Sequence, residues 1–520
     1  MNEATQNLTD WHWNEDYHCW CLEQVCYAAN PTVPQMQRLN IFVPGAYRNV
    51  DGSWNKNVQI SGYNVNTAPV VFENNAAGYV EMPAVNLGEE RCYARPYLEH
   101  GLIYISCGCR GRDSKDANGR LVGKAPINLI DFKVALRFLR HHAEQLPGDF
   151  NHIISVGWSA GGAMSSLLAL TGDNPLYEPY LQAEQAYLDE SDAVYAAQLY
   201  CPIVDLDHVD IAYEWNFFAD KTCEDSHAGP SETMSPFKEA FSKACFDRYV
   251  TYFNELELRH PQTNELLQLN PDGRSGSGYA YLMTCLEDAA TYFLQHLAAG
   301  DQPLGIQATP EQYLSGDYQQ PTVDRKPDFK EGEYILVPGT DKREWLSWDG
   351  KRAKIKDLDT YILNHRRRMK PCTSFDIFSG LCGENQLFGS PEEDFKHFAP
   401  DLPDIWEQLK DDWKDEYNRC HGAYENVRHD TAQAMQRFLI NPMNFVGTKE
   451  QEHSHQAEHY RIRVGARDAD TAWSTSMSLA VKLANAECGT VDYALVWDAP
   501  HSEADYEGEM LRWIDEVCKG

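Results

Sequence analysis

The chain has 520 residues, of which 43% are hydrophobic, so it is long enough for two domains or for one large domain that carries an insertion. Its 45 Lys and Arg residues against 78 Asp and Glu residues give a formal net charge of −33 at pH 7, which argues against nucleic acids and anionic membranes as partners. No apolar stretch is long enough to span a membrane and residues 1–8 lack a signal-peptide pattern, so we expect a cytoplasmic protein, with a secreted form whose signal has been removed as the alternative.

Seven short runs rich in β-branched and aromatic residues predict strands at 39–43, 69–72, 102–107, 153–156, 196–203, 460–464 and 491–497. Helical patterns lie between several of them, for example after Pro126 and near the C-terminus at 510–517. Strands that alternate with helices form a mostly parallel sheet with helices on both faces. The predicted fold class is therefore α/β.

The alternation stops after residue 203 and resumes near residue 460. Long helical patterns at 237–258 and 279–297 lie in between, followed by a stretch at 302–350 that Pro and Gly interrupt. We therefore expect residues 1–203 and 441–520 to form the main α/β domain and residues 204–440 to form a large inserted lid domain.

The strand at 153–156 leads into Gly157-Trp158-Ser159-Ala160-Gly161, which has the form of a nucleophile elbow. Glycines bracket Ser159 at the two positions where a Cβ atom would collide with the backbone of so sharp a turn. A G-x-S-x-G match alone is weak, and its alternative is a glycine-rich turn with an idle serine. The strand before the turn and the small-residue helix predicted at 163–170 favour the elbow.

A serine hydroxyl becomes a nucleophile when an imidazole takes its proton and a carboxylate orients that imidazole. On this kind of sheet the three groups follow different strands in the order Ser, Asp, His. Asp468 follows the strand at 460–464 and His501 follows the strand at 491–497, so both are expected at the same sheet edge as Ser159. Asp470 is the rival carboxylate, and Asp468 is preferred because it lies nearer the strand end. Taken alone, His501 would be a surface or capping histidine.

An attacked carbonyl develops a negative oxygen, which needs N–H donors already in position. One donor is expected to be the backbone N–H of Ala160, at the start of the helix. The second is expected from the small, flexible loop after the strand at 69–72. Ala76, Ala77 and Gly78 are the candidates there, with no choice made among them.

The sequence predicts no metal site and no cofactor. His453, His455 and His459 have a spacing that could offer metal ligands, but the sequence offers no carboxylate or cysteine at a matching spacing, so a solvated histidine-rich loop is favoured. The 15 cysteines are scattered and show no CxxC…CxxC spacing. Neither a GxGxxG nor a P-loop motif is present.

With these residues identified, the chain resembles the bacterial tannases, a branch related to the α/β-hydrolases. The resemblance runs through most of the length and includes several motifs peculiar to that branch. Beside the elbow, these are the segments 110–112, 122–126, 146–149, 200–203, 212–215, 368–370, 461–463 and 497–501. The disulfide that joins the serine and histidine neighbourhoods in fungal tannases is absent, because Trp158 precedes Ser159 and Ser502 follows His501.

The resemblance implies an α/β-hydrolase fold with Ser159, Asp468 and His501 as the catalytic triad. It also implies that Lys370, Glu384 and Asp470 bind the three phenolic hydroxyls of a galloyl ring. Without the resemblance, Lys370 would be a solvated charge at the end of a basic run (366–370), and Glu384 would be a turn residue.

The expected function is therefore that of a serine esterase that hydrolyses galloyl esters without a cofactor, with a small phenolic ester as its only expected partner. The alternatives are a feruloyl or broad aryl esterase, a serine peptidase, and a non-catalytic binding protein on the same scaffold. The sequence makes no prediction of the oligomeric state or of the natural ester.

Overall fold

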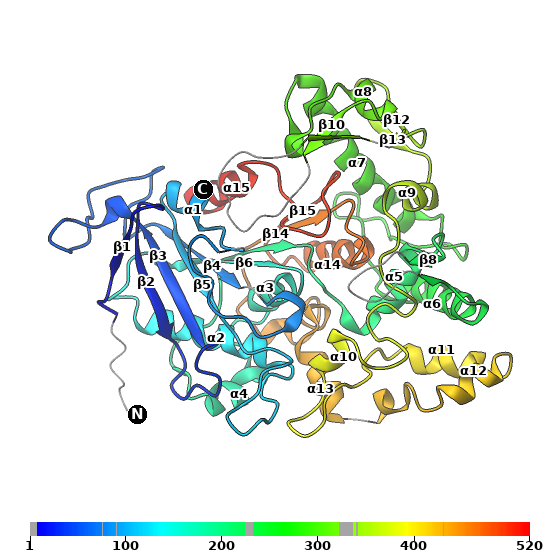
Figure 1. Cartoon of the computed structure of the whole chain (residues 1–520), viewed down its shortest axis with the longest axis horizontal. Helices are drawn as coiled ribbons and strands as arrows, with labels where there is room; N and C mark the ends of the chain where they lie inside the picture. Colours follow the sequence, from blue (N-terminus) through cyan, green and yellow to red (C-terminus); the bar gives the residue numbers. More distant parts are fainter. Residues whose placement is uncertain are drawn as a thin grey trace.

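The computed structural model describes residues 8–74, 76–89, 91–223, 232–321, 336–339, 342–429 and 431–520. Within these residues, nine strands form one sheet (Figure 1), in the spatial order β1, β2, β3, β5, β4, β6, β7, β14, β15. Their bounds are β1 His12–Asn14, β2 Cys19–Cys26, β3 Arg38–Pro44, β4 Pro69–Asn74, β5 Ile103–Cys107, β6 Asp149–Trp158, β7 Ala196–Tyr200, β14 His459–Gly465 and β15 Thr490–Val496.

Six neighbouring strands of this sheet, β5, β4, β6, β7, β14 and β15, run parallel to one another. At one side of the sheet, β1, β2 and β3 pair antiparallel. Parallel strands covered on both faces are buried along their length, and every residue of β4, β5 and β7 is buried. The α/β-hydrolase fold class predicted from the sequence is confirmed.

Helices cover both faces of the sheet. Tyr97 of α1 (Ala94–Glu99) stacks on Tyr104 of β5, whereas Phe132 of α2 (Ile127–His141) contacts Phe72 of β4. Tyr104 and Phe72 point to opposite faces, because Tyr104 pairs with Val71, the neighbour of Phe72. His100, at the end of α1, lies 3.0 Å from an oxygen of Asp515 on α15 (Glu509–Lys519), so we call this side the α1/α15 face.

All seven predicted strands are present in the sheet. The sequence analysis missed β1 and β2 at its outer side. A register shift between Leu22 and Val25 breaks the alternation of β2, and Gln24 there has a φ of 59°. Such a bulge removes the period of two from which a strand is predicted.

The segment predicted as an insertion, 204–440, lies between β7 and β14, which are neighbours in the sheet. Its helices are α5 Val209–Asn216, α6 Pro236–Glu255, α7 Ser277–Ala299, α8 Pro310–Ser315, α9 Leu358–His365, α10 Gly383–Leu387, α11 Leu402–Leu409, α12 Lys414–Arg419 and α13 Thr431–Leu439. Short antiparallel pairs join β8 Thr222–Cys223 with β9 Glu232–Thr233, β10 Gln319–Pro321 with β11 Leu336–Pro338, and β12 Leu346–Trp348 with β13 Ala353–Ile355. Part of the predicted 302–350 stretch lies outside the described residues.

The remaining helices belong to the two flanking segments: α3 Ala160–Leu170, α4 Glu178–Ala183 and α14 Trp473–Asn485. α3 packs on β6 and β7, and α14 packs on β14 and β15. No helix in the described ranges is both long enough and apolar enough to cross a membrane.

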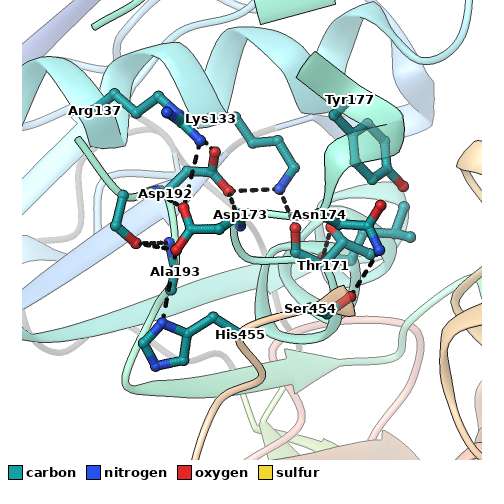
Figure 2. A network of polar contacts seen from close by, with 12 residues as sticks. Lys133, Arg137, Thr171, Asp173, Asn174, Tyr177, Asp192, Ala193, Ser454 and His455 are labelled. Carbon is teal, nitrogen blue, oxygen red and sulfur yellow. Dashed lines mark hydrogen bonds and ion pairs between the residues drawn. The ribbon is translucent and has the colours of Figure 1, made fainter. Parts of the chain in front are cut away.

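A buried ionic network fixes α2 to the connection between α3 and β7 (Figure 2). Asp192 accepts hydrogen bonds from Lys133 Nζ and from Arg137 Nε, both at 2.7 Å. Its backbone N–H donates to Asp173 at 3.0 Å. Lys133 and Asp192 are fully buried, so removing the Asp192 carboxylate would leave the Lys133 ammonium buried without its counter-charge. The network thus joins α2 to the C-terminal end of α3, whose N-terminal end carries the serine turn.

Candidate active site

Ser159 lies at a sharp turn between the last residue of β6 and the first residue of α3. Its backbone has φ 60° and ψ −121°, a conformation that L-residues rarely adopt. A Cβ on Gly157 would lie 2.1 Å from the carbonyl oxygen of Gly161, and a Cβ on Gly161 would lie 2.8 Å from Asn74 Oδ1. Both positions therefore require glycine, because neighbouring atoms approach too closely to leave room for a Cβ. The geometry is that of a nucleophile elbow.

The three residues predicted to act together form one chain of hydrogen bonds. Ser159 Oγ lies 2.9 Å from His501 Nε2, and His501 Nδ1 lies 2.8 Å from Asp468 Oδ2. Asp468 is fully buried and also accepts hydrogen bonds from Thr471 Oγ1 at 2.8 Å and from the backbone N–H of Asp470 at 2.8 Å. Of the two candidate carboxylates, Asp468 is thus the one bonded to the imidazole.

The electrostatics of this chain favour a charged imidazole next to a charged carboxylate. Burial lowers the pKa of His501, but the Asp468 carboxylate and, to a smaller degree, Cys201 outweigh it, so the pKa of His501 lies well above its usual value. Burial raises the pKa of Asp468, yet its interactions with His501 and Arg366 hold that pKa below the usual range. His501 can therefore accept the Ser159 proton while Asp468 stays ionised.

Arg366 is a site residue that the sequence analysis missed. Its guanidinium is fully buried, donates to the backbone carbonyls of Asp468 and Thr471, and stacks 3.7 Å from the ring centroid of Trp473. It holds the loop that presents the Asp468 carboxylate. No sequence pattern indicates this role, because Arg366 stands in a basic run that is typical of solvated surface.

The predicted donors for a carbonyl oxyanion lie on both sides of the serine turn. Ala160 begins α3, so its N–H belongs to the first turn, whose amides have no partner within the helix. Ala76 is buried, Ala77 is half-buried and Gly78 is exposed, and a Cβ on Gly161 would lie 3.6 Å from the Ala76 nitrogen. The 76–78 loop therefore approaches the turn, and the choice among its amides remains a prediction.

Tyr213 joins the loops that carry Lys370 and Asp470. Its hydroxyl accepts hydrogen bonds from the backbone N–H groups of Met369 at 3.2 Å and Lys370 at 3.0 Å, and donates to the carbonyl of Ala469 at 2.8 Å. Lys370 is 6% exposed, and its ammonium lies 3.4 Å from the ring centroid of Phe375. Within the described part of the chain, this ammonium makes no hydrogen bond or ion pair.

Glu384 lies on α10 and is half-buried, with one carboxylate oxygen 3.4 Å from Cys382 Sγ. Asn385, the next residue, donates to Asp376 at 2.7 Å, and that carboxylate also accepts from the backbone of Phe398 and Ala399 at 2.7 and 2.9 Å. A buried polar network thus fixes α10. The helix packs on the turn at 77–79, and burial and, to a smaller degree, the charge of Glu384 raise the pKa of Tyr79 there.

The basic run at 366–370 is not a solvated surface. Arg366, Arg368 and Lys370 are 1%, 0% and 6% exposed. Arg368 forms a bidentate pair with buried Glu214, at 2.8 and 2.6 Å. Without the family resemblance, Lys370 would be interpreted as a solvated charge at the end of this run, and the burial shows that this interpretation is wrong. The local pattern does not reveal the burial, because the partner of Arg368 lies far away along the chain. Glu384, for its part, lies in a short helix and not in a turn.

The histidine-rich segment does not gather into one site. His455 lies 3.6 Å from Asp173, whereas His459 is the first residue of β14 and contacts Thr490 at 2.8 Å. Among the described residues, one group of His, Cys, Asp or Glu has ligand atoms close enough together for a metal ion. It comprises Cys201, Asp468 and His501, two of which already belong to the hydrogen-bond chain.

A family model described as BD-FAE matches residues 117–221. Over 115 residues, the chain is 33% identical to the probable carboxylic ester hydrolase LipM of Mycobacterium tuberculosis (strain ATCC 25618 / H37Rv), a match that covers 22% of this chain and 24% of that relative. The chain thus spans about a quarter of the length of this relative.

Solved structures of tannin acyl hydrolases are similar to this chain over nearly its whole length. The native structure of tannin acyl hydrolase from Lactobacillus plantarum has a TM-score of 0.76 and 29% identity, with 96% of this chain and 94% of that chain covered. A tannin acyl hydrolase in complex with 3,4-dihydroxybenzoate has a TM-score of 0.74 and 30% identity, again with 96% and 94% covered. The likeness therefore includes the segment 204–440 as well as the sheet.

Proposed function

Because this chain belongs to the bacterial tannase family, we propose that it hydrolyses galloyl esters through an acyl-enzyme formed on Ser159. The chain is a carboxylic ester hydrolase, and the proposal adds the acyl group and the mechanism. One observation carries the mechanism: the hydrogen bonds from Ser159 Oγ through His501 to Asp468, at 2.9 and 2.8 Å.

In the proposed first half-reaction, His501 Nε2 takes the proton of Ser159 as Oγ attacks the ester carbonyl. The oxyanion is held by the N–H of Ala160 and by an amide of the 76–78 loop, and Asp468 stabilises the imidazolium. The C–O bond to the alcohol then breaks, and the alcohol leaves with the proton from His501. The product is a galloyl ester of Ser159.

In the second half-reaction, water takes the place of the alcohol. His501 accepts a proton from the water as its oxygen attacks the acyl carbon, and returns that proton to Ser159 Oγ when the acyl bond breaks. Gallate and the free serine result. No step requires a cofactor.

The proposed selection of the acyl group rests on Lys370, Glu384 and Asp470. A phenol both donates and accepts hydrogen bonds, so two carboxylates can accept from neighbouring hydroxyls while an ammonium donates to them. The buried Lys370 ammonium, which has no hydrogen-bond partner within the described residues, supports this role. A methoxy group in place of a hydroxyl cannot donate and would leave a carboxylate desolvated and unpaired. The site should therefore prefer galloyl to feruloyl esters.

A series of methyl esters tests this function. We expect the highest kcat/KM for methyl gallate, a lower value for methyl protocatechuate and a much lower value for methyl ferulate and methyl acetate. Equal rates on gallate and ferulate would favour a broad aryl esterase. Activity on peptides or on no ester would favour a peptidase or a binding protein instead.

We further propose that residues 204–440 form an inserted lid domain over the main domain of residues 1–203 and 441–520. The lid contributes Lys370 and Glu384, whereas Asp470 comes from the main domain. Binding would then require both parts, and the partner is a small phenolic ester.

A further inference from the structure

A cavity of about 480 Å³ lies beside the serine turn, on the α1/α15 face of the sheet. This volume is in the range of pockets that hold one small organic molecule. Its walls come from the carboxyl ends of β4, β6 and β7, from the start of α1 and from the segment 503–511 that leads into α15. Sheet register explains the location: Glu73 pairs with Val156, and Trp158 pairs with Tyr200, all on the face toward which Tyr104 points.

The cavity lies beside the serine turn, although neither Ser159 nor His501 is among its lining residues. Trp158, which immediately precedes Ser159, lines it, and the indole ring lies 5.5 Å from the imidazole of His501. Ala77 of the 76–78 loop lines it too. None of Lys370, Glu384 and Asp470 is among the lining residues. An ester that places its acyl ring against those three residues would therefore have its alcohol part free to enter this cavity.

The lining is suited to an uncharged aromatic molecule. Tyr93, Tyr97, Trp158, Tyr200 and Tyr506 contribute aromatic rings, and Met510 and Leu511 contribute aliphatic surface. Rings of this kind pack against a flat aromatic occupant in stacked or edge-on arrangements. The Arg91 guanidinium also lines the cavity and lies 5.6 Å from the ring centroid of Trp158. Most of the lining is aromatic or aliphatic, so an occupant with flat apolar faces gains more from burial than a saturated sugar, which would have to find a partner for each of its many hydroxyls.

Carboxyl groups at the same walls disfavour an anionic occupant. Glu503, Asp505 and Glu507 line the cavity, and Asp505 is ion-paired with Arg461 at 2.8 Å. Burial and the charge of Glu503 raise the pKa of Glu73 to about 8, against the opposing hydrogen bond from Tyr104, so this lining group is largely uncharged at neutral pH. Carboxylates accept hydrogen bonds from phenolic hydroxyls, so hydroxyls on an aromatic occupant would find partners here.

We propose that this cavity binds the alcohol part of the ester and that its preferred occupant is a hydroxylated aromatic alcohol. The proposal rests on the proposed function, in which Ser159 Oγ bonds to the acyl carbon as the C–O bond to the alcohol breaks and His501 delivers the proton to the departing oxygen. The released alcohol then lies in the cavity until it dissociates.

Leu511→Trp is the direct test, because the larger side chain would occupy part of the cavity. We expect kcat/KM for the gallate ester of a flavan-3-ol to fall at least tenfold and kcat/KM for methyl gallate to stay within twofold of wild type. Glu516→Trp, at an exposed position of the same helix, is the matched control and should change neither value. Free flavan-3-ol should inhibit the wild type and lose this inhibition in Leu511→Trp.

Leu511→Ala provides the second variant if the larger residue prevents folding, and it should weaken inhibition by the free flavan-3-ol. Equal losses on both esters, no loss on the flavan-3-ol ester, or a loss confined to glucose gallate would overturn the proposal. The acetate esters of methanol and of the flavan-3-ol separate the cavity proposal from the proposed galloyl function. If Leu511→Trp lowers the rate on the flavan-3-ol acetate but not on methyl acetate, and no gallate is hydrolysed, the cavity proposal stands and the galloyl function is rejected. If methyl gallate is hydrolysed but Leu511→Trp affects the two alcohols equally among both gallates and acetates, the cavity proposal alone is rejected.

Discussion

Arg112 donates a hydrogen bond from Nε to the carbonyl oxygen of Gly78, with an N···O distance of 2.9 Å. The same guanidinium donates to Gln386 on α10, the helix that carries Glu384. Its backbone N–H also donates to the carbonyl of Tyr79 at 2.7 Å. One arginine thus joins the loop proposed for the oxyanion to the helix proposed for the acyl ring.

Replacing Arg112 by Met should therefore lower kcat on every ester, because the 76–78 loop would lose its fixed position. A hydrogen bond from a charged group contributes about 1.5–3 kcal/mol, which predicts a fall of roughly 10- to 100-fold in kcat on methyl gallate and on methyl acetate alike. Steady-state kinetics on both esters measures it, and Arg112→Lys should recover part of the loss.

The matched control is Arg120→Met, which removes an exposed arginine paired with Asp116 and should leave both rates unchanged. Melting temperatures of all variants show whether a loss comes from unfolding. A normal kcat in a folded Arg112→Met protein would remove this arginine from the positioning of the loop.

The raised pKa of His501 predicts how activity depends on pH. The base must be neutral to take the Ser159 proton, so activity is lost as pH falls through the pKa of His501. Because Asp468 and Cys201 outweigh burial and raise that pKa above 6.5, the acid limb of kcat/KM should lie at a higher pH than 6.5. A pH–rate profile with methyl gallate measures this limb.

Asp468→Asn should lower kcat by about 10⁴, as the loss of the orienting carboxylate does in other serine hydrolases. An acid limb below pH 6.5 in the wild type would contradict the electrostatic account.

The proposed contacts to the acyl ring predict a selective loss. Lys370→Met and Glu384→Gln each remove a charged hydrogen-bond partner. Each variant should lose about 1.5–3 kcal/mol of transition-state stabilisation with methyl gallate, so kcat/KM should fall by one to two orders of magnitude. Methyl acetate has no phenolic hydroxyl and should be affected little. Lys356→Met and Glu392→Gln, both at exposed positions, are the controls. An equal loss on methyl acetate would count against direct contacts with the ring.

Tyr213→Phe should affect binding of the acyl group and stability together. The substitution leaves two backbone N–H groups and one carbonyl without their partner, which costs about 1–3 kcal/mol of folding free energy for each buried group left unpaired. It also releases the Lys370 loop from the Asp470 loop, so KM for methyl gallate should rise more than kcat falls. Urea unfolding and kinetics measure the two effects. Tyr180→Phe, whose half-exposed ring lies on α4, should change neither, and an unchanged KM in Tyr213→Phe would separate Tyr213 from the site.

Much of the sheet was predictable because its strands are short, apolar and bounded by turn residues. The central parallel strands are buried on both faces, and this makes their runs continuous and easy to detect. The outer strand β2 escaped detection because its bulge at 22–25 interrupts the pattern. The burial of Arg368 also could not be foreseen, because its partner Glu214 is brought to it by the fold.

The candidate site divides in the same way. Ser159, Asp468 and His501 could be proposed from strand ends, since parallel strands deliver their following loops to one edge. Lys370 and Glu384 came from a family resemblance alone, because neither has a local pattern. Arg112, Tyr213 and Arg366 act through backbone carbonyls or N–H groups of distant segments, and sequence spacing carries no sign of such bonds.

The central claim is that Ser159 forms a covalent acyl-enzyme. Rapid acid quenching of the wild type during turnover of methyl gallate, followed by mass spectrometry, measures it directly. We predict one added galloyl group, located on the peptide that contains Ser159, and neither adduct nor turnover in Ser159→Ala. Hydrolysis of methyl gallate by Ser159→Ala, or an adduct on another residue, would contradict the account.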